Sequence, residues 1–237
     1  MALPKIASPE FEATIPSTGQ KVFFRPFLVK EEKALYMAME GNEQNEIINA
    51  VVKVLSACIR EDVDVASLSY FDIEYLFLKL RAKSVGDVVT LRFRHGGEDP
   101  ACKHVQEVPI DLDKVELERT EGHTDKIMIT DDVGIKLKYP SLDTARRLGN
   151  LNTNNLDDVF EFLTDSVEYI FDKEQVYEDT TKPEIKEWLE DLGQKQFEKV
   201  MNFFNTMPKL RQKLVYKCDK CGKEEKITIE GLQGFFG

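Results

Sequence analysis

Two stretches of the chain follow one plan: FRHGGEDPACKHVQEVPIDL at residues 93–112 and YKCDKCGKEEKITIEGL at residues 216–232. They align without a gap from the last cysteine of each onward, so that Cys102 falls on Cys221. In each stretch apolar residues alternate on both sides of a short loop, a pattern typical of strand, turn and strand. The sequence therefore predicts two similar β-hairpins far apart along the chain.

The alignment extends beyond the cysteines. Its aligned pairs are Val108 with Ile227, Ile110 with Ile229, Leu91 with Leu214, Phe93 with Tyr216, and His95 with Cys218. The loop of the first copy is longer by about the four residues Gly-Gly-Glu-Asp. This is the layout of a zinc ribbon, in which two hairpin knuckles each donate two ligands to one tetrahedral ion.

The second copy carries the stronger half of such a site. Cys218 and Cys221 stand three positions apart on a tight turn, where two thiolates converge on one ion. Gly222 lets the chain turn beneath the metal because it has no Cβ. A redox pair or two idle thiols are the other interpretations of this Cys-x-x-Cys spacing.

The first copy offers Cys102 together with either His95 or His104. We favour His95 because it falls on Cys218, whereas His104 falls on Lys223, beyond the knuckle. The expected ligands of one structural zinc ion are His95, Cys102, Cys218 and Cys221. Since the first copy lacks paired cysteines, a degenerate site without metal is the alternative.

Such a site would be structural, because four protein ligands leave no open position for water or substrate. It would tie residue 95 to residue 218 and close the chain between them into an insertion. Small hairpins of this kind are seldom stable unaided, so metal would hold the two halves in register.

The remaining sequence predicts a mostly helical body with short hairpins. We expect hairpins at 11–27, around Ser17-Thr18-Gly19, and at 126–139, and helices at about 30–40, 43–60, 70–82, 142–148, 156–171, 183–191 and 194–206. The fold class is α+β with a split zinc-ribbon-like module. One compact chain of 237 residues is expected to contain an N-terminal hairpin with helices at 1–84, two ribbon halves at 86–112 and 209–237, and a hairpin plus helical insertion at 113–208.

Composition narrows the function. Hydrophobic residues make up 42% and charged residues 32%, an ordinary globular profile. No stretch approaches the roughly 20 apolar residues of a membrane helix, and the first residues do not resemble a signal peptide. A net charge of −11 disfavours general nucleic-acid binding. Lys and Arg residues do cluster at 208–226, however. This segment is either a pair of strands whose charges face solvent or a basic face that docks a partner.

No catalytic constellation is evident, so we expect no enzyme. The sequence has no Gly-rich phosphate loop, nucleophile elbow or His-Glu-x-x-His helix. Cys58 lies in an apolar helical stripe and is expected to be a buried core residue. His123 lies in a polar stretch and is expected to be an exposed loop residue.

The run IPSTGQKVFFRPFLVKEEKALYMAMEG at residues 15–41 resembles the start of the T-even-type myophage baseplate hub family. The helix with Ile-Ile-Asn-Ala, the knuckle followed by VPIDL and the terminal knuckle are also similar to that family, so the resemblance covers most of the chain. It implies a late, non-enzymatic role in virion morphogenesis, as a hub component or a chaperone-like assembly factor. It also suggests that residues 16–19 and 25–33 form a shared structural or contact element.

The favoured hypothesis is a tail baseplate hub assembly protein that binds other hub or tail proteins. It would act in the host bacterial cytoplasm or remain in the virion baseplate. The alternative is a zinc-ribbon nucleic-acid-binding adaptor that uses the basic segment. An enzyme with a redox pair at Cys218 and Cys221 ranks third.

Overall fold

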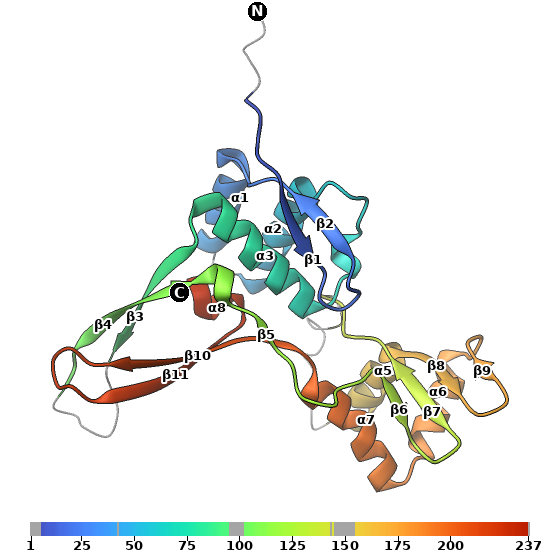
Figure 1. Ribbon diagram of the computed structural model, residues 1–237. Helices are drawn as coiled ribbons and strands as arrows, with labels where there is room; N and C mark the ends of the chain where they lie inside the picture. Colours follow the sequence, from blue (N-terminus) through green and yellow to red (C-terminus); the bar gives the residue numbers. More distant parts are fainter. Residues whose placement is uncertain (1–5, 42, 95–101, 143, 145–154, 237) are drawn as a thin grey trace, which may run out of the picture. The chain divides into compact units, whose positions relative to one another are not determined.

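The computed structural model describes residues 6–41, 43–94, 102–142, 144 and 155–236 (Figure 1). The fold class is α+β, as predicted from the sequence. The chain folds into two compact units, and most contacts between residues fall within one unit or the other. The first unit contains Met1–Val65, Phe71–Glu118 and Lys209–Gly237, and the second contains Ala66–Tyr70 and Arg119–Pro208. The domain boundaries expected from the sequence stay a prediction beside this division.

The first unit begins with an antiparallel hairpin of β1 (Phe11–Thr14) and β2 (Lys21–Phe24). Gly19 closes the turn with a φ of 73°, and its N–H donates to the carbonyl of Ile15 at 2.8 Å. The turn chemistry predicted for Ser17-Thr18-Gly19 is therefore correct, since only glycine adopts this backbone conformation without strain.

Three helices follow the hairpin: α1 (Val29–Glu40), α2 (Gln44–Cys58) and α3 (Tyr70–Val85), with the short η1 (Val65–Ser67) before α3. Buried residues of α2 recur at helical spacing, as the sequence pattern predicts: Ala50, Val51, Val54, Leu55 and Cys58. Helix α3 is buried on several sides, and even its acidic Asp72 and Glu74 are nearly inaccessible. Asp72 accepts a hydrogen bond from the Ser17 N–H at 2.8 Å, which ties α3 to the first hairpin turn.

Two longer hairpins form the ribbon part of this unit. The first pairs β3 (Val88–Arg94) with β4 (Val105–Asp111), and the second pairs β10 (Lys209–Lys217) with β11 (Glu224–Glu230). Strand β5 (Leu117–Glu118) adds to the start of β10, and the helix α8 (Gly231–Phe236) follows β11. One hydrophobic core joins these elements to α3: Leu78, Ala82, Ile110, Leu112, Val115, Leu210, Ile229 and Phe235.

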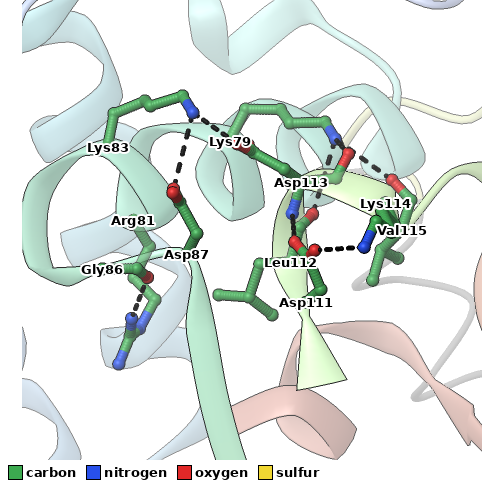
Figure 2. A network of polar contacts seen from close by, with 10 residues as sticks. All are labelled: Lys79, Arg81, Lys83, Gly86, Asp87, Asp111, Leu112, Asp113, Lys114 and Val115. Carbon is green, nitrogen blue, oxygen red and sulfur yellow. Dashed lines mark hydrogen bonds and ion pairs between the residues drawn. The ribbon is translucent and has the colours of Figure 1, made fainter. Parts of the chain in front are cut away.

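A polar network fixes the β3–β4 hairpin to α3 (Figure 2). The ammonium of Lys79 donates to the carbonyls of Leu112, Asp113 and Val115 at 3.4, 2.7 and 3.2 Å. These carbonyls belong to the short helix η2 (Leu112–Lys114), which follows β4 directly, and to the residue after it. Burial lowers the pKa of Lys79. The half-buried lysine thus satisfies backbone acceptors at the point where the ribbon leaves the helical body.

The second unit holds an antiparallel sheet with the strand order β6-β7-β8-β9. Its strands are β6 (Lys126–Met128), β7 (Gly134–Leu137), β8 (Val167–Phe171) and β9 (Val176–Tyr177). The helices α5 (Leu156–Ser166), α6 (Lys182–Glu190) and α7 (Gln194–Thr206) accompany it. Their apolar faces share one core with the sheet, built around Ile135, Leu137, Leu163, Leu189, Val200 and Phe203.

The helix predicted over 156–171 is wrong in its last part. Helix α5 ends at Ser166, and residues 167–171 form β8, where Ile170 lies opposite Ile135 of β7. The apolar residues of this stretch fit helical spacing, but β7 offers an open edge that the β-rich run VEYIF can pair with. Of the helix expected at 142–148, nearly all lies outside the described residues.

Among the described residues, no helix combines the length and the apolar character that crossing a membrane requires.

Candidate metal centre

The second knuckle is a tight turn between β10 and β11. The N–H of Cys218 donates to the carbonyl of Lys223 at 2.8 Å, and the N–H of Gly222 donates to the carbonyl of Cys218 at 2.8 Å. Gly222 has a φ of 74°, which is the left-handed conformation that glycine adopts readily because it has no Cβ. This turn places Cys218 inside the molecule and Cys221 at its surface.

The first knuckle brings Cys102 to the same place. Its sulfur lies 3.9 Å from the sulfur of Cys218, and the Sγ atoms of Cys102, Cys218 and Cys221 all lie within 4.8 Å of one another. Cys102 and Cys218 are 6% and 1% exposed. Two chain segments far apart in sequence thus meet at three thiols.

The geometry of these thiols fits a metal ion. In a tetrahedral zinc site with Zn–S bonds of about 2.3 Å, neighbouring sulfurs lie roughly 3.8 Å apart. The 3.9 Å between Cys102 and Cys218 is close to that spacing and far beyond a disulfide bond of about 2.05 Å. Three converging thiols could therefore bind a soft or borderline metal such as zinc.

The fourth ligand expected from the sequence, His95, lies outside the described residues. His104 is described, and it is not part of the group of ligand atoms that meets within 4.8 Å. Of the four predicted ligands, the structure thus brings three together. The choice of His95 as the fourth ligand stays a prediction.

The strand pairing repeats between the two hairpins. Leu91 lies opposite Val108 in the first hairpin, and the aligned Leu214 lies opposite Ile227 in the second. Likewise Val89 faces Ile110, and Gln212 faces Ile229. The alignment made from the amino-acid sequence therefore agrees with the register in which the strands pair. The two copies are two versions of one strand-knuckle-strand unit.

Direct contacts join the two hairpins near the thiols. The Gln106 side chain donates to the Asp219 carboxylate at 2.9 Å, and its Oε1 accepts from the Asp219 N–H at 3.1 Å. Phe93 stacks on Tyr216 with ring centroids 6.0 Å apart. Phe93 and Tyr216 occupy aligned positions of the two copies, although the alignment did not predict that their rings meet. Sequence reasoning missed Gln106 and Asp219, since nothing marks an exposed pair as mutual partners.

The electrostatics of the knuckle favour a thiolate at Cys218. Its pKa is lowered, first by the hydrogen bond from the Cys221 N–H and further by that from the Lys220 N–H. Thiolate is the form that binds metal, so the turn itself prepares this ligand. Cys58 contrasts with it: burial in α2 raises its pKa to about 11. Cys58 is a core residue, as predicted.

The expectation of an exposed His123 is wrong. In the second unit this residue is half-buried, with Nδ1 2.9 Å from the Thr206 hydroxyl and Nε2 3.0 Å from the Tyr139 hydroxyl. Its ring stacks on Phe203 at 5.1 Å. The neighbouring residues in the sequence are polar, and they do not indicate that Phe203 of α7 packs against the His123 ring.

The basic segment at 208–226 is partly paired within its own unit. Arg211 bonds to Glu118 at 3.2 Å and to Glu230 at 2.6 Å, and Lys213 bonds to Glu118 at 2.5 Å. The charges of Arg211 and Lys213 are therefore balanced by carboxylates, which agrees with a solvated strand pair at these two positions.

A pair of cysteine-bearing knuckles on an α+β body defines the class of protein: an α+β fold with a candidate metal centre. Residues 8–237 match the family model described as T4 bacteriophage base plate protein. The chain belongs to this family, which the N-terminal motif and the knuckles also indicated. Comparison with curated proteins and with solved structures gave no significant match.

Proposed function

We propose that this protein assists assembly of the tail baseplate hub by binding other hub or tail proteins, as a chaperone-like factor or as a structural component. The observation that carries the proposal is the family match over residues 8–237, nearly the whole chain. The proposal includes no enzymatic step and places the protein in the infected host cytoplasm or in the baseplate.

The proposed metal site serves this role as a clamp. Cys102, Cys218 and Cys221 would hold one zinc ion, with His95 as the fourth ligand. The ion would cross-link these residues, and four protein ligands would leave it no open position for water or substrate. By joining the two knuckles, it would keep the ribbon in one shape for a partner to recognise. The contacts of Gln106 with Asp219 support such a joined arrangement, because they act in the same place.

The function is tested by co-purification from infected cells. A tagged chain should recover named hub or tail proteins in stoichiometric amounts from tail intermediates, as identified by mass spectrometry. Recovery of none of them from any intermediate would overturn the proposal. An assembly factor would be present in intermediates and absent from finished tails, whereas a component would remain.

The metal is tested separately by native against denaturing mass spectrometry. We expect one zinc per chain, lost in Cys102→Ser and in His95→Ala. Cys58→Ser is the matched control, since Cys58 lies in the core of α2, and it should keep the ion. Retention of zinc in Cys102→Ser would exclude the split site.

A further inference from the structure

The second unit carries a groove between the end of its sheet and α6. It has a volume of about 670 Å³ and is lined by Asp172 and residues 175–180 of the segment between β8 and α6, together with Val133, Ile170, Glu184 and Trp188. Every one of these residues belongs to the second unit. None belongs to the candidate metal centre, so the groove is a separate feature of the fold.

The lining of the groove is acidic. It contains the carboxylates of Asp172, Glu178, Asp179 and Glu184, and it includes no Lys or Arg. Asp172 is held in place by hydrogen bonds from the N–H groups of Glu174 and Gln175 at 2.8 and 2.9 Å, and these bonds lower its pKa. The groove therefore presents negative charge to whatever enters it.

The groove also has apolar and aromatic walls. Val176 and Tyr177 of β9 are 51% and 40% exposed, and Trp188 of α6 packs against the core of the unit while remaining partly accessible. The faces of Trp and Tyr rings attract cations, Arg most often. Strand β9 is the last strand in the order β6-β7-β8-β9, so an extended chain can lie along the sheet's edge there.

We propose that this groove binds an extended, cationic segment of a partner protein, with Arg or Lys side chains between apolar ones. The carboxylates complement the cations, and Trp188, Tyr177 and Val176 cover the apolar positions. A bare divalent ion fits less well. Among the described residues, the three cysteines form the only group of three or more potential ligands whose atoms all lie within 4.8 Å of one another. The Asp172 and Glu184 carboxylates already accept hydrogen bonds from Tyr177 and Thr181.

This inference deepens the proposed function and rests on it, because it names the chemistry of one partner. It has its own test, since Trp188 is the only tryptophan of the chain. Its fluorescence reports on the groove directly. The probe is a capped peptide that alternates arginine and leucine, titrated into the full-length protein, with the matching glutamate–leucine peptide as the negative control.

We expect a saturable change in Trp188 emission with the arginine peptide and none with the glutamate peptide. The double variant Glu178→Lys, Asp179→Lys should weaken binding at least tenfold. Glu121→Lys, Glu198→Lys makes the same charge change on exposed residues of the second unit that do not line the groove. It should weaken binding less than threefold.

Equal weakening by both double variants would overturn the proposal, because it would show general attraction to an acidic protein. The same emission change with Mg²⁺ alone, or no saturable change, would overturn it too. Thermal unfolding of both variants checks that they fold. If the groove variant still recovers hub proteins from infected cells, the groove inference fails while the proposed function stands.

Discussion

At the scale of single residues, His123 shows how a residue of a polar loop becomes half-buried through contacts with distant elements. Both ring nitrogens contact hydroxyls, and the ring stacks on Phe203. Burial lowers its pKa below the ordinary value of 6.5 and outweighs the opposite effect of the Asp125 carboxylate. The folded protein therefore resists a protonation that the unfolded chain accepts.

That shift makes the second unit sensitive to acid. Below the ordinary pKa of 6.5 the unfolded chain binds a proton that the folded His123 does not, so stability falls as the pH drops from 6.5 toward the lower folded pKa. In His123→Phe, which keeps an aromatic ring, we expect this part of the pH dependence to vanish. Thermal unfolding between about pH 5 and pH 8 measures it. An unchanged slope in the variant would refute the assignment.

Gly134 is a second residue whose role depends on packing. Its φ is not among the positive values of the described glycines, so backbone conformation does not explain why a glycine stands there. It lies at the start of β7, where an added Cβ would collide with the Phe171 ring of β8, whose Cε atoms would be only 2.8 Å away. The glycine is required by the ring that covers it.

Gly134→Ala should therefore destabilise the second unit by about 1–3 kcal/mol, the usual cost of overpacking. For a unit of this size, this corresponds to a melting temperature roughly 4–24 °C lower. The matched control is the same substitution in a Phe171→Leu background, where the smaller side chain can move aside and the added cost should shrink. Equal costs in the two backgrounds, measured by denaturant unfolding, would contradict the packing explanation.

At the scale of elements, the junction between α3 and η2 depends on Lys79 (Figure 2). One ammonium serves three carbonyls, and Lys83 adds ion pairs with Asp87 and Asp113. The Lys83 pairs are exposed and contribute little. The half-buried Lys79 contributes more, because its loss leaves backbone acceptors without their donor.

Lys79→Met keeps most of the apolar stem and removes the charge. We expect a loss of about 1–3 kcal/mol in the stability of the first unit. Lys114→Met is the control, since the Lys114 side chain is 82% exposed and pairs only at the surface with Asp111. It should change stability by less than about 0.5 kcal/mol. Similar losses in the two variants, measured by urea unfolding, would show that the three carbonyl contacts add nothing.

At the scale of the whole molecule, the chain leaves the first unit after Glu118 and returns to it at Lys209. The candidate metal ligands Cys102, Cys218 and Cys221 lie on both sides of this excursion and belong to the first unit. A metal ion there would close the first unit without touching the second.

Chelation of the metal should accordingly destabilise one unit only. If free zinc stands at a hundred times its dissociation constant, its removal costs about 2.7 kcal/mol, which lowers the first unit's melting temperature by roughly 5–10 °C. The transition of the second unit should not move. Scanning calorimetry, with limited proteolysis to assign the transitions, measures both. A loss confined to the second unit, or no loss in a chain shown to contain zinc, would contradict the clamp.

The sequence alone determined the features that depend on local pattern. Alternating apolar residues fixed the four long ribbon strands, helical spacing fixed α2 and α7, and the repeated knuckle letters indicated that Cys102 meets Cys218 and Cys221. These predictions succeed because period, turn chemistry and cysteine spacing act over a few residues.

The tertiary structure decided what depends on distant partners. Residues 167–171 form β8 because β7 pairs with them, Gly134 is needed because Phe171 covers it, and His123 is half-buried because α7 supplies Phe203 and Thr206. The Gln106–Asp219 bond and the acidic groove beside Trp188 also arise only from packing. A local sequence pattern does not specify which distant surface a residue will contact. Where local preference and long-range contacts favour different structures, the long-range contacts decide.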